Sequence, residues 1–130
     1  MLDGKNFDAW NLLKQNLHGR DVSKLFYKEG EIWFCSIGVN IGWEKDGKNE
    51  TFDRPVIILK KFWPSLFLGI PCTTKKQSGR GVYKFVLHAT QYTALFSQIR
   101  VLDCRRLRRL VAVADGAVFR SLCDAFKVWL

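Results

Sequence analysis

The sequence predicts a small, mainly β domain of the SH3-like barrel class, an α+β fold with one helix at each end. Three observations lead to this prediction. From Glu31 onward, the spacing of apolar side chains changes from a helical period to a period of two. Five short strands are predicted in this part of the chain, most of them joined by brief connections. The chain has 130 residues, 48% of them hydrophobic, which suits one domain with its own core.

The first segment is predicted to be a helix. Asn6 is a suitable cap, Gly19 suits the end, and the apolar residues between them recur at near-helical spacing. These residues are Phe7, Trp10, Leu13 and Leu17. Residues 20–28 are expected to be a linker. We therefore expect residues 1–28 to form a helical arm that packs on the barrel domain, residues 29–130.

Five strands are expected in the barrel domain. The first has apolar side chains on both faces, so it is expected to be buried on both sides. Turns that contain proline, glycine or lysine separate the later ones. A long polar loop, residues 40–53, follows the first strand, with Gly42 and Gly47 as its flexible points. The expected strands cover residues 31–37, 55–59, 66–70, 82–87 and 96–102.

The chain is expected to end in a second helix. Asp103 is suited to cap a short helical turn through Leu107, and Asp115 is suited to cap the final helix. One face of that helix is apolar, which predicts that it packs on the barrel. The residues of this face are Val118, Leu122, Ala125, Phe126 and Trp129.

Charge is distributed unevenly along the chain. Residues 1–50 hold 7 Lys and Arg against 8 Asp and Glu, a net charge of −1. Residues 51–130 hold 14 against 4, a net charge of +10, and the two parts sum to the overall +9. Such a basic segment favours a polyanionic partner. The alternative is a solvated basic face that serves solubility.

The four cysteines do not predict a metal site. Cys35, Cys72, Cys104 and Cys123 are separated by 37, 32 and 19 residues, with no Cys-x-x-Cys pair and no histidine at ligand spacing. No acidic cluster suits a divalent metal either, so neither metal nor cofactor is expected. A disulfide scaffold is an alternative. Buried, reduced thiols of a cytoplasmic protein are favoured, because the hydrophobic core is large enough to be stable without disulfide bonds.

No membrane segment is expected. The chain begins without the pattern of a signal peptide, since an acidic residue comes early and no apolar run follows. The most apolar stretch, residues 62–70, contains Pro64 and is too short to span a bilayer.

Two histidines are the usual candidates for acid–base chemistry. His18 and His88 together with a lysine would suit ribonuclease chemistry. However, His18 is placed near the end of the predicted arm helix, where a cation suits the helix dipole, and His88 follows a strand. We therefore favour structural roles for both.

A group of polar residues at strand ends and in the long loop remains as a candidate site. If the second and third strands pair antiparallel, Arg54 and Thr73 lie at the same end of the barrel. An arginine beside a hydroxyl can form a phosphate-binding site, because the guanidinium binds two phosphate oxygens at once. Both residue types are also common in ordinary loops. The group consists of Glu44, Arg54, Thr73, Lys75, Lys76, Ser97 and Gln98.

Four sequence blocks resemble the MazF/PemK toxins, in the same order as in that family. They span residues 28 to 130 approximately. Each block is modest alone, and the specificity comes from their combination. They are Glu29-Gly-Glu-Ile-Trp33; Asn40-Ile-Gly-Trp-Glu44 followed by Arg54-Pro-Val-Ile-Ile58; Ile70-Pro-Cys-Thr-Thr74; and Ser97-Gln-Ile-Arg-Val-Leu-Asp103.

The resemblance implies a homodimeric, sequence-specific endoribonuclease toxin that cleaves single-stranded RNA and is neutralised by a cognate antitoxin. The family's catalytic pair matches Arg54 and Thr73, and a loop glutamate linked to activity matches Glu44. The sequence departs from the family in three places. Its loop between Glu44 and Arg54 is longer than in the shortest members, residues 1–28 lie outside the common core, and residues 111–116 are unusually apolar.

Metal-independent RNA cleavage uses the 2′-hydroxyl of the substrate as the nucleophile and leaves a 2′,3′-cyclic phosphate and a 5′-hydroxyl. It needs a proton acceptor, stabilisation of charge on the phosphorus and a proton for the leaving oxygen. Arg54 suits charge stabilisation, because its pKa makes it a poor proton acceptor. Thr73 suits hydrogen-bond donation, and Glu44 is the best base on chemical grounds.

Residues around the expected site are candidates for RNA binding. Trp43 and Phe52 are predicted either to stack on unpaired bases or to act as lids over the barrel end. The further RNA-binding candidates are Thr74, Lys75, Lys76, Ser97 and Gln98.

Two other functions stay open at this point. The same fold occurs in CcdB-like toxins, which bind gyrase and cleave nothing, and a non-catalytic RNA-binding module would use the same basic surface. The presence of both Arg54 and Thr73 favours the enzyme. A homodimer is expected from the resemblance and from more large apolar side chains than one small barrel buries. These are Trp33, Phe62, Trp63, Phe67 and Trp129.

Overall fold

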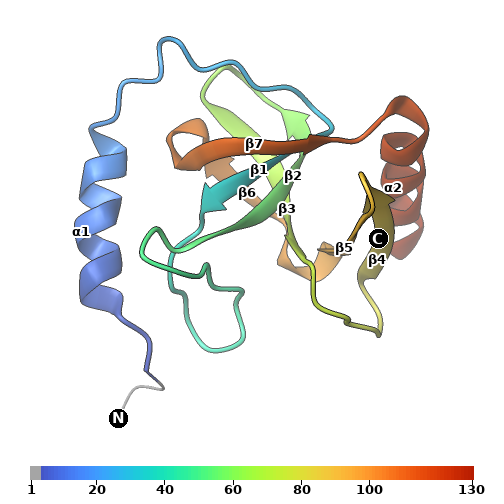
Figure 1. Cartoon of the computed structure of the whole chain (residues 1–130), viewed down its shortest axis with the longest axis horizontal. Helices are drawn as coiled ribbons and strands as arrows, with labels where there is room; N and C mark the ends of the chain where they lie inside the picture. Colours follow the sequence, from blue (N-terminus) through green and yellow to red (C-terminus); the bar gives the residue numbers. More distant parts are fainter. Residues whose placement is uncertain (1–3) are drawn as a thin grey trace.

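The structure is a computed structural model that describes residues 4–130. It contains seven strands, two α-helices and two short 3₁₀ turns (Figure 1). In chain order these are α1 (Phe7–His18), β1 (Glu31–Ser36), β2 (Asp53–Lys61), β3 (Leu66–Thr73), β4 (Val82–Leu87), β5 (Thr90–Leu95), η1 (Phe96–Gln98), β6 (Arg100–Asp103), η2 (Cys104–Arg106), β7 (Leu107–Val113) and α2 (Gly116–Trp129).

All strands belong to one antiparallel, strongly bent sheet. Its order is β4-β5-β3-β2-β1-β7, and β6 pairs with the first half of β3, Leu66–Gly69, while β5 pairs with its last two residues. The sequence-based class, a small mainly β fold with a C-terminal helix, is confirmed. The hydrogen bonds do not close the sheet into a barrel, however. β4 and β7 end the order, and β6 pairs with β3 alone.

Two strands were missed by the sequence pattern, and one expected strand is shorter. β5 follows β4 through a two-residue turn in which His88 and Ala89 both have positive φ, 50° and 64°. Glycine, asparagine or aspartate normally marks such a turn, so its sequence carries no signal. The expected strand at 96–102 begins with the 3₁₀ turn η1, and only residues from Arg100 pair as β6. The first half of the apolar stretch at 111–116 is explained by β7, which ends at Val113.

Both helices begin where the capping residues predict. The side chain of Asn6 accepts a hydrogen bond from the amide of Ala9, and that of Asp115 accepts one from the amide of Val118. The expected cap at Asp103 is also formed, on the amide of Arg105. α1 and α2 lie at opposite sides of the sheet (Figure 1).

The bent sheet has a hydrophobic cluster on each face. One lies under α2, where Leu122 is fully buried against residues such as Ile57, Ile70 and Phe96. The other contains Trp33 and Phe67 and is covered by the segment before β1. The expected surplus of apolar side chains is therefore smaller than predicted, because Trp33 and Phe67 belong to the core. Phe62, Trp63 and Trp129 do stay exposed.

The segment at 20–28 is more than a linker, because it covers the second cluster. Tyr27 is buried, packs edge-on against Phe67, and donates its hydroxyl to the carbonyls of Trp63 and Pro64. Val22 and Leu25 pack beside it. The ordinary role of such a segment is to shield apolar residues of the sheet from water.

All four cysteines are free thiols. Cys35, Cys72 and Cys104 are buried as expected, whereas Cys123 on α2 is half-buried. Burial raises the pKa of Cys35 and of Cys72 to about 12. Within residues 4–130, neither helix has the length and hydropathy needed to cross a membrane.

Candidate active site

The pairing of β2 with β3 brings Arg54 and Thr73 to the same end of the sheet. Val56 lies opposite Pro71, and the same antiparallel register continued by two residues sets Arg54 across from Thr73. This is the placement that the strand pattern predicts. Both side chains line one cavity of about 170 Å³. Its full lining is Phe34, Lys48, Asn49, Asp53, Arg54, Pro55, Thr73, Thr74 and Lys75.

Arg54 is held by one edge of its guanidinium. The residue is only 8% exposed, and its Nε donates a 2.7 Å hydrogen bond to the carbonyl oxygen of Asp46. Within residues 4–130, its two terminal nitrogens make no hydrogen bond of their own. Burial lowers the pKa of Arg54, but a guanidinium stays protonated at neutral pH. Two fixed donors are therefore available for the oxygens of an anion.

Thr73 is the last residue of β3 and is 4% exposed. Its Oγ1 accepts a 3.2 Å hydrogen bond from the amide of Lys75. A hydroxyl that accepts from the backbone keeps its own proton to donate. Thr73 is thus oriented to donate a hydrogen bond to a ligand in the cavity.

Lysines surround this pair and lower one another's affinity for protons. The pKa of Lys48 is lowered chiefly by the neighbouring amine of Lys75. The pKa of Lys45 is lowered by burial and then by Arg54 and Lys75. Cations that lower one another's pKa repel each other, and a bound anion would reduce this repulsion. Lys45 and Lys48 were missed as site residues, and only their spacing around Asp46-Gly47 in the loop hinted at them.

Glu44 lies in a neighbouring cavity of about 330 Å³ together with Ser97 and Gln98. Its Oε1 accepts a 2.9 Å hydrogen bond from the amide of Ile41, so the carboxylate caps its own turn. The structure therefore does not bring Glu44 into the cavity of Arg54 and Thr73. The full lining of this second cavity is Asn40, Glu44, Lys45, Pro71, Ser97, Gln98, Ile99 and Arg100.

The backbone of Lys45 and Asp46 makes hydrogen bonds to a residue of each cavity. The amide of Lys45 donates to Oε1 of Gln98 at 3.0 Å on one side, and the carbonyl of Asp46 accepts from Arg54 on the other. Gln98 also donates from Nε2 to the carbonyl of Trp43 at 3.3 Å. Gln98 therefore fastens the loop to the segment before β6.

The other residues predicted to bind RNA lie in different places, and only some of them line the cavity. Thr74 and Lys75 line the cavity of Arg54, whereas Lys76 is exposed in the following turn and lines neither cavity. Trp43 is 97% exposed at the tip of the loop. Phe52 instead packs edge-on against Trp10 of α1, with ring centroids 5.8 Å apart, so its ring serves packing between the arm and the loop.

No three His, Cys, Asp or Glu side chains in the described part of the chain gather in a group that could hold a metal ion. The chemistry available at the site is that of a buried guanidinium, a hydroxyl donor, lysines and the carboxylate of Asp53. The Oδ2 of Asp53 accepts from the hydroxyl of Thr51 at 2.7 Å.

Fold and site together define a small antiparallel β domain with a cavity lined by Arg54, Thr73 and lysines at the ends of two central strands. No family model and no curated protein matches the sequence. Among solved structures, the fold is that of MazF. MazF from Deinococcus radiodurans is similar, with a TM-score of 0.63 and 18% identity over 78% of this chain and 94% of that one.

A second solved structure, described as an endoribonuclease in complex with its cognate antitoxin from a mycobacterial species, is also similar. It has a TM-score of 0.60 and 13% identity, over 80% of this chain and 94% of that one. The chain thus has a MazF-like fold that spans nearly the whole of both solved proteins.

Proposed function

We propose that this chain is a MazF-type endoribonuclease toxin that cleaves single-stranded RNA at short specific sequences without a metal ion. The observation that carries the proposal is the cavity shared by Arg54 and Thr73, with Lys48 and Lys75 in its wall. A phosphate at this place would meet three kinds of donor at once: a guanidinium fork, a hydroxyl and ammonium groups. The similarity to MazF in fold supports the same function.

In the proposed reaction, the 2′-oxygen of the substrate attacks the adjacent phosphorus and the 5′-oxygen leaves. The terminal nitrogens of Arg54 stabilise the negative charge that develops on the phosphoryl oxygens. Thr73 donates a hydrogen bond to one of these oxygens. The departing 5′-oxygen takes its proton from an ammonium group in the cavity wall, Lys48 or Lys75. The products are a 2′,3′-cyclic phosphate and a 5′-hydroxyl, and no bond to the protein forms.

The proton of the 2′-hydroxyl needs an acceptor within reach of the scissile phosphate. Asp53 lines the same cavity as Arg54, and its Oδ1 has no hydrogen-bond partner within residues 4–130. We therefore assign the acceptor role to Asp53, in place of Glu44 as the sequence suggested. Glu44, with Ser97 and Gln98 in the neighbouring cavity, would then hold the next nucleotide of the strand.

The cognate partner proposed for this toxin is an antitoxin protein, and the active unit proposed is a homodimer. The mycobacterial endoribonuclease of similar fold is in complex with its cognate antitoxin. An acidic segment of an antitoxin would suit the cationic cavity and would compete there with RNA.

Cleavage of a long single-stranded RNA in the presence of EDTA tests the proposal. Fragments that end in cyclic phosphate and 5′-hydroxyl are expected. Fragments with 5′-phosphate ends, or cleavage that stops with EDTA and returns with Mg²⁺, would overturn the mechanism. RNA binding without cleavage would instead identify a non-catalytic RNA-binding module, and the absence of both would leave a CcdB-like interaction module.

A further inference from the structure

The N-terminal arm reaches the candidate site through Lys5. The Nζ of Lys5 donates hydrogen bonds to the carbonyls of Asn40 (2.6 Å) and Gly42 (3.1 Å). The same nitrogen lies 3.2 Å from Oδ2 of Asp46, with the two side chains only 13% and 27% exposed. One ammonium group thus ties three residues of the 40–53 loop together.

Asp46 connects this ammonium to Arg54. Its Oδ1 accepts a 2.6 Å hydrogen bond from the amide of Asn40, which closes the loop on itself. Its backbone carbonyl accepts the 2.7 Å hydrogen bond from Nε of Arg54. The side chain of Asp46 therefore belongs to the contact with the arm, while its backbone holds the guanidinium.

A second contact of the arm fixes the other end of the loop. Trp10 is 7% exposed and packs against Phe52, whose backbone carbonyl accepts from the amides of Ile37 and Gly38. Gly38 has a φ of +83°, and a Cβ there would overlap the indole of Trp10. Only a glycine at position 38 leaves room for the indole of Trp10, so the backbone there accommodates the arm.

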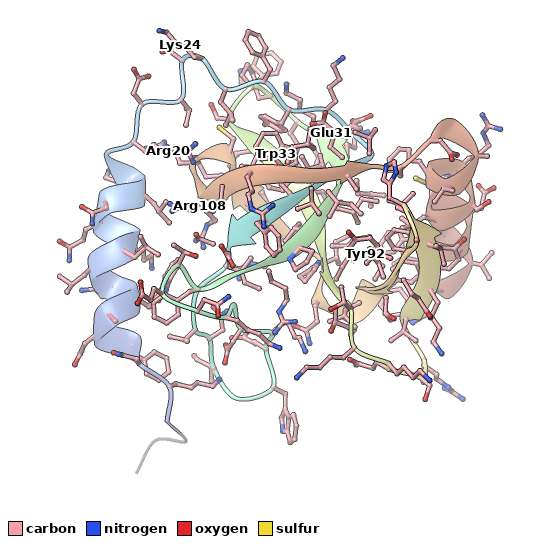
Figure 2. The ribbon with its side chains drawn as sticks, in the orientation of Figure 1. Arg20, Lys24, Glu31, Trp33, Tyr92 and Arg108 are labelled. Carbon is pink, nitrogen blue, oxygen red and sulfur yellow. The ribbon has the colours of Figure 1, made fainter. Side chains whose placement is uncertain are left out.

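The far end of the arm is anchored at η2 and at the start of β7. Arg20 donates from Nη1 to the carbonyls of Arg105 (2.9 Å) and Leu107. Figure 2 shows Arg20 at the end of α1, beside the segment that leads into β7. The arm is therefore held at both ends, and it spans from η2 to the 40–53 loop.

From these contacts we propose that the arm is a positioning element of the active site. Lys5 and Trp10 hold the 40–53 loop so that the carbonyl of Asp46 fixes Nε of Arg54 and leaves both terminal nitrogens facing the cavity. Lys5 and Asp46 are positioning residues, since neither lines the cavity with Arg54 and Thr73. The expected effect on cleavage rests on the proposed function, whereas the effect on the arginine geometry does not.

The variant Lys5→Met removes the ammonium group and keeps most of the side-chain stem. We expect the cleavage rate to fall about 10- to 100-fold, as misplacement of a transition-state group does. The salt dependence of RNA binding is expected to stay the same, because Asp46 already neutralises Lys5. Lys5→Arg restores most of the rate, since Arg keeps the charge and the donors. Lys14→Met, in α1 of the same arm and without a side-chain hydrogen bond within residues 4–130, is the matched control.

The Nε–Hε signal of Arg54 in ¹⁵N NMR spectra gives a readout that does not depend on activity. This signal, assigned by its loss in Arg54→Lys, is expected to shift in Lys5→Met while the backbone amide signals of the strands stay in place. Asp46→Asn removes the same ion pair without a change in the arm. Its effect and that of Lys5→Met should not add in the double variant.

An unchanged Nε–Hε signal in both Lys5→Met and Asp46→Asn would overturn the proposal, as would cleavage within twofold of the wild-type rate. If the wild-type chain cleaves no RNA, the proposed function fails, and the NMR signal alone decides whether the arm positions Arg54.

Discussion

The guanidinium of Arg109 lies 4.5 Å from the ring centroid of Phe34, its partner across the β1–β7 pair. Phe34 also lines the cavity of Arg54 and Thr73. The cationic surface therefore continues from the cavity, over an aromatic ring, to the free edge of the sheet at β7. An RNA strand bound in the cavity has a path along this surface.

Replacement of Arg109 by Met is expected to weaken RNA binding and to lower the slope of log K against log salt by about 1, as loss of one phosphate contact does. Binding of a 2′-O-methylated RNA, which cannot be cleaved, measures this. Arg108 is skipped in the β1–β7 register and forms no cation–π contact within residues 4–130, so Arg108→Met is the control. Equal effects of both variants would argue against this path.

Removal of either central donor is expected to abolish most of the cleavage. Arg54→Ala and Thr73→Ala should each lower the rate about 100-fold or more, the usual cost of a lost transition-state donor. Thr73→Ser keeps the hydroxyl and should recover much of the rate. His18→Ala and His88→Ala are controls that should retain most activity. Near-normal rates in Arg54→Ala and Thr73→Ala, with thermal stability preserved, would move the site elsewhere.

Asp53 and Glu44 are expected to differ in which kinetic constant they affect. Asp53→Asn should lower kcat with little effect on KM, because it removes the proton acceptor. Glu44→Gln should raise KM more than it lowers kcat, because Glu44 lies in the neighbouring cavity. Single-turnover and steady-state rates on one short RNA measure both. The reverse pattern would return the acceptor role to Glu44.

Thiol reactivity should follow burial. In the folded protein at pH 8, we expect a disulfide reagent to react readily with Cys123 and slowly with the three buried cysteines, while all four react after denaturation. Fast reaction of more than one thiol in the folded state would contradict the buried placement.

The buried thiols of Cys35 and Cys72 make the free energy of unfolding depend on pH in the alkaline range. Burial raises the pKa of Cys35 and Cys72 from 9.0 to about 12, so the unfolded chain releases these protons at lower pH than the folded one. Their contribution to the free energy of unfolding is complete below pH 9.0 and is lost as pH rises toward about 12. Denaturant titrations between these pH values measure the decrease, and variants with alanine at both positions should show less of it.

A homodimer is expected in solution. Sedimentation at micromolar concentration should give about 30 kDa, twice the 15.1 kDa of one chain. Apolar side chains that stay exposed, such as Trp63 at 76%, provide surface for such an interface. A strictly monomeric species that cleaves RNA at full rate would disprove the dimer as the active unit.

The sequence by itself determined the elements whose signals are local. Asn6 and Asp115 predicted the starts of both helices, because a capping side chain acts on an amide three residues away. A period of two predicted β1, and short apolar runs joined by a turn predicted β2 and β3. An antiparallel pairing of β2 with β3 predicted that Arg54 and Thr73 lie at the same end. A short turn joins the end of β2 to the start of β3, so the two strands run side by side and their far ends, with Arg54 and Thr73, are also neighbours. This part of the site therefore follows from order and spacing.

Only the tertiary structure decided what depends on contacts between distant segments. β5 was not predicted, because the turn at His88 and Ala89 contains no glycine to mark it. β7 was not predicted, because its extent is set by its pairing with the distant strand β1. The separation of Glu44 from Arg54 follows from the fold of the 40–53 loop. That fold is set by Lys5 and Trp10 of the N-terminal arm and by Gln98 of η1. Side chains in a long loop have no periodic pattern, so their positions are decided by the residues that the fold brings to them.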